Sequence, residues 1–269
     1  MSAQNALFVE IKPPTLDLKN HIVICNWAVD GETIIAKLCG PALLEQKTIV
    51  IVSEDAASIP ATGVGLGKAK GLVWAVPGDP SEDNVLELAN IREASAVIVL
   101  TDQKSHKGGF EEASIHPADV KTIHISLAVK RLAPEVYLCV ELAEERDREF
   151  LLRANADEIV SGEGVGAKLI AQAALTHSAT FLYQHLLNNA VDTNEPYLVM
   201  APDSFIGATF RQLQEALLPE EVILVGLKTS DGAQINPKGE LTIEPGDELF
   251  VIGYTESEVQ RIIQKTNLL

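Results

Sequence analysis

The stretch that decides the fold is residues 71–102, GLVWAVPGDPSEDNVLELANIREASAVIVLTD. An apolar run at 72–76 ends at a Pro-Gly-Asp-Pro turn, a helical pattern covers 82–91, and a second apolar run at 96–100 ends in Thr101 and Asp102. Two strands joined by a crossover helix must be parallel. Open α/β sheets bind ligands at the carboxyl ends of such strands, so these polar strand ends predict a ligand crevice.

The same alternation extends over the first 160 residues. Strands are predicted at 21–25, 48–52, 72–76, 96–100, 136–142 and 158–160, and helices at 31–45, 82–91, 120–132 and 144–155. Six strands alternating with helices indicate an α/β fold, a Rossmann-like doubly wound parallel sheet.

The remainder of the chain has a different pattern. Short strands are predicted at 197–200, 222–227 and 248–253, with helices at 207–217 and from 256 onward. Strands spaced this closely and joined by short turns favour an antiparallel meander. Between the two parts, one long amphipathic helix is predicted from 165 to 189, because its apolar residues recur at helical spacing and it is too polar to span a membrane. We therefore divide the chain into a tether (1–20), a Rossmann-like N-lobe (21–162), a crossover helix segment (163–192) and a smaller α+β C-lobe (193–269).

The net charge and the cysteine content indicate which classes of partner and which compartment to expect. The chain of 269 residues carries 21 basic and 38 acidic residues, a net charge of −17. This charge repels phosphate backbones and anionic lipid surfaces, so nucleic acid and direct lipid binding are not expected. The three cysteines lack the number and spacing of a disulfide framework, and no signal peptide opens the chain. We expect a cytoplasmic location.

Motifs in both lobes carry a family resemblance. The GDPS turn with its helix and the VIVLTD strand, followed in the tail by GATFRQL, VILVGLKTSDG and INPKGELTIEPGDELFVIG, resemble the regulator of potassium conductance (RCK, or Trk-type KTN) domain. The resemblance implies a ligand-sensing gating-ring domain, held at the inner face of the membrane by a potassium channel pore. It also implies a homodimer, paired through the crossover helices, that assembles into an octameric ring. The alternative is a free-standing Trk or Ktr regulatory subunit; the predicted tether favours a channel.

A nucleotide site is predicted at the carboxyl edge of the sheet. The turn after the first strand reads Asn26-Trp27-Ala28-Val29-Asp30-Gly31 and keeps only the third glycine of a G-x-G-x-x-G fingerprint, the one that serves helix–strand packing. Ala28 and Asp30 disfavour a pyrophosphate, so an adenine mononucleotide is expected to bind better than NAD. Candidate site residues are Asn26, Trp27, Ala28, Gly31, Glu54, Asp55, Gly78, Asp79, Thr101 and Asp102, with Glu54 or Asp55 accepting from a ribose or else capping the segment that follows.

Calcium is the second predicted ligand. Asp102 and Glu141 end neighbouring parallel strands, and the resemblance implies that carboxylates at these places bind calcium in calcium-gated members. Ala143 stands where the family pattern has a further acid, so we expect weak affinity, roughly 0.1 to 1 mM.

The rival class is an enzyme, a dehydrogenase on the same scaffold. The region after residue 193 contains no histidine, and the chain offers no nucleophile–base pair or Walker lysine. The sequence therefore favours a regulatory domain over an oxidoreductase.

Overall fold

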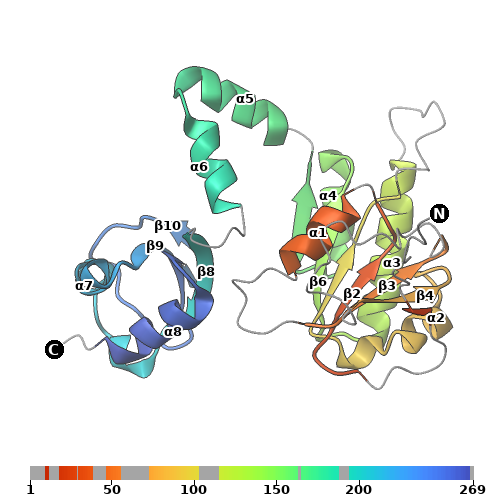
Figure 1. The fold of residues 1–269 in the computed structure, drawn as a ribbon, viewed down its shortest axis with the longest axis horizontal. Coiled ribbons are helices and arrows are strands. Elements are labelled where there is room, and N and C mark those ends of the chain that lie inside the picture. Colours follow the sequence, from red (N-terminus) through yellow and green to blue (C-terminus); the bar gives the residue numbers. More distant parts are fainter. Residues whose placement is uncertain are drawn as a thin grey trace, which may run out of the picture. The chain divides into compact units, whose positions relative to one another are not determined.

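The computed structural model describes residues 10–11, 18–28, 30–38, 47–55, 73–102, 115–162, 165–187 and 194–266. These residues belong to two compact units, and the chain passes from the first to the second between Ala174 and Leu175. Each unit has its own sheet (Figure 1). Each also has its own core of buried side chains.

The first unit contains a parallel sheet. Its strands are β1 (Glu10–Ile11), β2 (Ile22–Cys25), β3 (Ile49–Ser53), β4 (Val73–Pro77), β5 (Ala96–Val99), β6 (Tyr137–Leu142) and β7 (Glu158–Ser161), in the order β1-β4-β3-β2-β5-β6-β7. The six predicted strands and their parallel pairing are confirmed. A two-residue strand, β1, lies within the segment predicted as a tether and pairs with β4 at the sheet edge.

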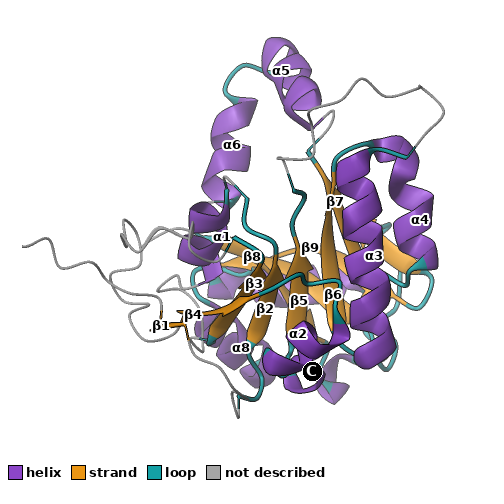
Figure 2. Cartoon of the chain, turned by 90° about the vertical axis from the view of Figure 1, so that its right-hand side faces the viewer, coloured by secondary structure: helices purple, strands orange, loops and turns teal. Residues whose placement is uncertain are grey.

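Alternate strand residues form two cores, one on each face of this sheet. Val23, Val50 and Val97 point to one face with side chains of α2 (Asp83–Leu88), α3 (Pro117–Leu132) and α4 (Arg148–Arg153). Ile22, Ile49 and Ile51 point to the other face with Ile35 of α1 (Gly31–Leu38). A sheet covered on both faces is what near-continuous apolar strands require. Figure 2 shows α3 and α4 beside β6 and β7.

Several helix bounds differ from the predicted ones. The helix predicted at 144–155 opens with a 3-10 turn at Glu145–Asp147, and the one predicted at 82–91 ends at Leu88 before a 3-10 turn at Ile91–Glu93. Residues 39–45 of the first predicted helix lie outside the described residues. These differences concern helix ends, where sequence patterns are least informative.

The prediction of one continuous crossover helix is wrong. The structure has two helices, α5 (Val165–Leu175) and α6 (Ala179–Leu186), separated at Thr176–Ser178. Ser178 has φ 69°, a left-handed conformation that an α-helix cannot contain. Thr, His and Ser are weaker helix formers than the Ala and Leu residues around them, so the break falls at this polar triplet.

The second unit contains a four-stranded antiparallel sheet in the order β10-β9-β11-β8. The antiparallel pairing is as predicted, but the predicted meander is wrong, because β11 lies between β8 and β9 and only β9 and β10 are consecutive neighbours. Its elements are β8 (Glu195–Met200), α7 (Phe210–Leu217), β9 (Ile223–Thr229), β10 (Gly232–Ile235), β11 (Glu248–Gly253) and α8 (Glu256–Lys265). Helix α7 begins later than predicted because Thr209 is its N-cap, in a capping box with Gln212. Leu213 of α7 and Val259 of α8 pack with Leu249 of β11 in a separate core, which confirms an α+β lobe.

In the part of the chain that the structure describes, no helix combines the length and apolar character needed to cross a membrane.

Candidate functional site at the carboxyl edge of the parallel sheet

The strand order places the candidate residues at one edge. From β2 the chain moves outward to β3 and β4 and then returns to the other side of β2 for β5. This reversal between β2 and β5 is the switch point at which open α/β sheets form a ligand crevice. The predicted residues follow four strands at this edge, and Glu141 lies near the end of a fifth: Asn26–Ala28 after β2, Glu54–Asp55 after β3, Gly78–Asp79 after β4, Thr101–Asp102 after β5, and Glu141 in β6.

Asn26 ties the two strands at the switch point together. Its Nδ2 donates a hydrogen bond to the carbonyl oxygen of Leu100 at 2.9 Å, and its backbone N–H donates to Val52. The residue has φ 70°, which asparagine tolerates better than most residues, and is only 5% exposed. Asn26 therefore fixes the shape of the turn, and one hydrogen of its amide N–H₂ group is used in the bond to Leu100.

The Trp27 ring packs closely against Gly31. A Cβ atom on Gly31 would lie 2.6 Å from the indole ring of Trp27, so the ring occupies the space beside the first residue of α1. The glycine was predicted to serve helix–strand packing; the close approach in the structure is to Trp27 instead. Ala28 accepts a hydrogen bond from the Gly31 N–H, which closes the turn. The start of α1 is thus packed by an aromatic ring at the place where a dinucleotide fingerprint has open glycines.

Hydrogen bonds and close packing hold the turn after β4 in place. The Asp79 carboxylate accepts hydrogen bonds from the backbone N–H and the hydroxyl of Ser81, both at 2.9 Å. A Cβ on Gly78 would come within 2.8 Å of the Val85 methyl groups, so this position requires glycine. These contacts fix the Asp79 side chain beside the crevice.

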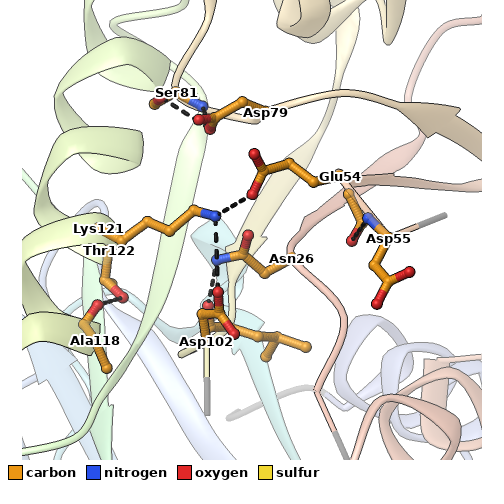
Figure 3. A network of polar contacts seen from close by, with 11 residues as sticks. Asn26, Glu54, Asp55, Asp79, Ser81, Asp102, Ala118, Lys121 and Thr122 are labelled. Carbon is orange, nitrogen blue, oxygen red and sulfur yellow. Dashed lines mark hydrogen bonds and ion pairs between the residues drawn. The ribbon is translucent and has the colours of Figure 1, made fainter. Parts of the chain in front are cut away.

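A lysine that the sequence analysis did not single out lies among these acidic residues. Lys121 reaches from α3 and donates a 2.7 Å hydrogen bond to Glu54, and its ammonium is 3.8 Å from Asp102 (Figure 3). Partial burial lowers the pKa of Lys121, but the hydrogen bond and charge of Glu54 and the charges of Asp79 and Asp102 raise it by more. The net pKa lies above the ordinary lysine value, and the ammonium form is stabilised.

The two predicted calcium ligands each have a partner within the protein. One oxygen of Glu141 accepts from both the backbone N–H (2.8 Å) and the hydroxyl (2.9 Å) of Thr101, and Asp102 pairs with Lys121. The described residues contain no group of three or more His, Cys, Asp or Glu side chains that could hold a metal ion. The Asp102–Glu141 site therefore stays a prediction, with residues 103–114 outside the described part.

Two buried carboxylates hold α3 against this edge. Asp119 accepts from the backbone N–H groups of Ala143 and Glu144 at 2.8 and 3.0 Å, and Asp147 accepts from the N–H of His116 at 2.9 Å. Burial raises the pKa of Asp119, while the two backbone hydrogen bonds oppose the rise. The hydrogen bonds of Asp119 and Asp147 together fix α3, the helix that carries Lys121.

The sequence analysis missed Lys121 because it belongs to no motif. Lys121 is 67 residues from Glu54 in the chain, and a lysine on a predicted helix is ordinarily a solvated residue. The position of Asp119 in the first turn of α3 could be predicted, since acidic residues are favoured there, but its partners Ala143 and Glu144 could not. The alternative role of Glu54 and Asp55 as caps concerns a segment, 56–72, that lies outside the described residues.

Comparisons with known proteins agree with this architecture. Residues 17–140 match the family model of the calcium-activated potassium channel slowpoke-like RCK domain. Residues 163–267 match the model of Castor and Pollux, described as part of a voltage-gated ion channel. The two matches divide the chain between the parallel and the antiparallel sheet regions.

Individual relatives are distant. The putative potassium channel protein YugO of Bacillus subtilis is 23% identical over 239 residues, covering 87% of this chain and 66% of its own. The calcium-gated potassium channel TvoK of Thermoplasma volcanium is 23% identical over 247 residues, covering 92% and 66%. This chain thus spans slightly less than two thirds of the length of both relatives.

A solved structure shares the fold. The human SLO3 gating ring superposes with a TM-score of 0.65 at 18% sequence identity, covering 91% of this chain and 45% of the other. The predicted resemblance is confirmed by the family model and the potassium channel relatives. Residues 17–140 of this chain are therefore similar to the RCK domains of potassium channels.

Proposed function

We propose that this chain is the ligand-sensing gating-ring part of a potassium channel, in which a ligand bound at the carboxyl edge of the parallel sheet changes the opening of the pore. The observation that carries the proposal is the gathering of polar side chains at the β2–β5 switch point, in a region that matches an RCK domain model. A regulatory role needs a selective binding site and a connection to a moving partner, and no catalytic group. A free-standing potassium-uptake subunit is the alternative assembly of the same domain.

A nucleotide carrying adenine is the proposed ligand of the crevice. Glu54 is the first residue after β3, the position from which an acidic residue accepts hydrogen bonds from ribose hydroxyls in dinucleotide-binding folds. The packed Trp27–Gly31 turn and Asp30 disfavour a pyrophosphate there, which supports a mononucleotide over NAD. Calcium at Asp102 and Glu141 is the second proposed ligand; TvoK, a relative, is described as calcium-gated.

The assembly proposed for this function is a homodimer that builds an octameric ring beneath the pore. Helices α5 and α6 support it, since α5 has no buried residue and carries Ile170 and Leu175 on its surface. In α6, Phe181 is 67% exposed and Leu182 is also exposed. Apolar side chains gathered on exposed helices are typical of surfaces that pair with another subunit.

Binding and flux measurements together test the function. The purified chain is titrated calorimetrically with AMP, NAD and calcium, and potassium flux is recorded from vesicles containing a chimera in which this chain follows the pore of TvoK. We expect a ligand that binds the chain to change the flux, and Glu54→Gln to abolish the response to a nucleotide. Flux through a conducting chimera that ignores every ligand the chain binds would refute the gating role.

A further inference from the structure

A small pocket lies in the second unit, at the corner between the end of α7 and the start of β9. Helix α7 ends at Leu217, a 3-10 turn covers Leu218–Glu220, and β9 begins at Ile223. The pocket has a volume of about 280 Å³. The residues that line it are Gln214, Glu215, Leu218, Val222, Ile223 and Leu224.

Most of the pocket lining is apolar. Val222 and Leu224 are buried, whereas Leu218 is 65% exposed and Ile223 is 50% exposed. The side-chain amide of Gln214 donates a 3.3 Å hydrogen bond to the carbonyl oxygen of Leu224, which holds the end of α7 to β9. An aliphatic chain that enters the pocket would remove its own methylene groups and the two exposed side chains from water, which is favourable.

The charged groups at this pocket are acidic. Glu215 is the ionisable residue of the lining, and the turn after α7 adds Glu220 and Glu221; all three are exposed. The ion pairs that the described part of this unit forms use other carboxylates. The net charge of −17 on the whole chain also attracts cations. The pocket therefore favours a ligand with a positive charge over a neutral ligand or an anion.

We propose that this pocket binds a small aliphatic amine in its protonated form, with the ammonium at Glu215 and the alkyl chain against Leu218 and Ile223. The ligand is small, because pockets for drug-sized ligands have volumes of about 300–1,000 Å³. An exposed ion pair contributes little, so the alkyl chain supplies most of the affinity, which is roughly millimolar. The site lies in the other unit from the proposed nucleotide and calcium sites and does not depend on them.

Methyl NMR of the full chain, labelled at isoleucine and leucine methyl groups, measures binding at the pocket itself. The signals of Ile223 and Leu218 are followed during titration with n-pentylamine, n-butylamine and n-pentanol. The signal of Ile206, an exposed isoleucine of the same unit outside the lining, is the control. Thermal melting establishes that each variant is folded. The variants are Glu215→Gln, Leu218→Ser and, as the matched control at an exposed glutamate outside the lining, Glu244→Gln.

We expect the Ile223 signal of wild type to respond to n-pentylamine at about threefold lower concentration than to n-pentanol, because the ammonium gains an exposed ion pair. Removing one methylene, in n-butylamine, should weaken binding about fourfold. Glu215→Gln should abolish the preference for the amine over the alcohol. Leu218→Ser should weaken the binding of both compounds, and Glu244→Gln should bind as wild type does.

Four results would overturn the proposal. Equal response of wild type to the amine and the alcohol would refute the preference for a cation. Shifts of Ile206 equal to those of Ile223, or unchanged binding in both Glu215→Gln and Leu218→Ser, would show only a general attraction of amines to an acidic protein. Tighter binding of N-acetyl-lysine amide than of n-pentylamine would assign the pocket to a lysine of a partner protein. No shift of Ile223 would reject the site and leave the nucleotide proposal unaffected.

Discussion

Lys121 of α3 donates a 2.7 Å hydrogen bond to Glu54, the first residue after β3, across 67 residues of sequence. The Glu54 side chain is 58% exposed and that of Lys121 is 23% exposed, so the ion pair is solvated at its carboxylate. Exposed ion pairs contribute little to folding. The pair is therefore better placed to meet a ligand than to stabilise the fold.

The substitution Glu54→Gln separates a role of Glu54 in ligand binding from a role in the stability of the fold. Because the pair is solvated, the substitution should lower the free energy of unfolding by less than about 1 kcal/mol. It should weaken adenosine binding at least about tenfold, because the carboxylate that accepts the ribose hydroxyls is lost. Urea denaturation and calorimetry measure the two effects, and a large loss of stability with intact binding would assign Glu54 a structural role.

Gly31→Ala tests the packing of Trp27. The added methyl group would lie 2.6 Å from the ring, so the ring must move, and overpacking of this kind costs about 1–3 kcal/mol. Fluorescence of Trp27, recorded in a Trp74→Phe background, should shift to longer wavelength as the ring enters water. Gly162→Ala is the control, since nothing lies within 4 Å of its added methyl group. An unshifted spectrum would mean that the ring does not need the glycine.

Calcium binding is tested at Asp102 and Glu141. If these carboxylates hold calcium, the melting temperature of wild type should rise with millimolar calcium, because a ligand of the folded state stabilises it. Asp102→Asn with Glu141→Gln should remove the rise. Equal gains in wild type and the double variant would place any calcium site elsewhere.

His21 predicts a pH dependence of stability. The residue is buried, and its Nε2 lies 2.9 Å from the carbonyl oxygen of Ala89. Burial lowers the pKa of His21 below 6.5, and the backbone hydrogen bond opposes this only in part. As the pH falls below 6.5, the unfolded chain takes up a proton that the folded protein resists, so stability is present above pH 6.5 and is lost below it, toward the folded-state pKa.

The comparison of His21→Gln with wild type isolates this effect. The wild type should lose up to about 1.4 kcal/mol per pH unit more than the variant between pH 6.5 and the folded pKa of His21, in urea denaturation. Contributions of other titrating groups, including Asp119, to the pH dependence of stability cancel when the variant is compared with the wild type. The exposed His177, replaced by Gln, should leave the pH profile of the wild type unchanged. Parallel profiles for wild type and His21→Gln would contradict the prediction.

Leu182→Asp tests the pairing through α6. Light scattering should show a dimer or larger assembly for wild type and a shift to monomer for the variant, because a charge would be buried in an apolar contact. Gln184→Glu, which places a charge on an exposed residue of the same helix, measures the effect of charge alone. A monomeric wild type would refute the proposed dimer.

The sequence by itself determined the parallel sheet and the edge at which its polar residues gather. Apolar strands such as Val73–Pro77 and Ala96–Val99 alternate with helices, and this order permits only parallel pairing with strand ends at one edge. It also determined the change to an antiparallel lobe, because short turns such as the one between β9 and β10 allow only antiparallel pairing of the strands they join. These properties depend on residues that are neighbours along the chain.

Tertiary structure decided which side chains meet at the carboxyl edge of the sheet. Two contacts depend on side chains brought together from distant elements: Glu141 accepts from Thr101, and Lys121 donates to Glu54. The packing of Trp27 against Gly31 depends on the conformation of the turn between them. The break at Ser178 was likewise settled by one backbone conformation, which the same polar triplet could have avoided. Local propensity and periodicity act over a few residues, whereas these contacts depend on strand order and helix placement, so the sequence pattern specified the frame of the site and the packed fold specified its chemistry.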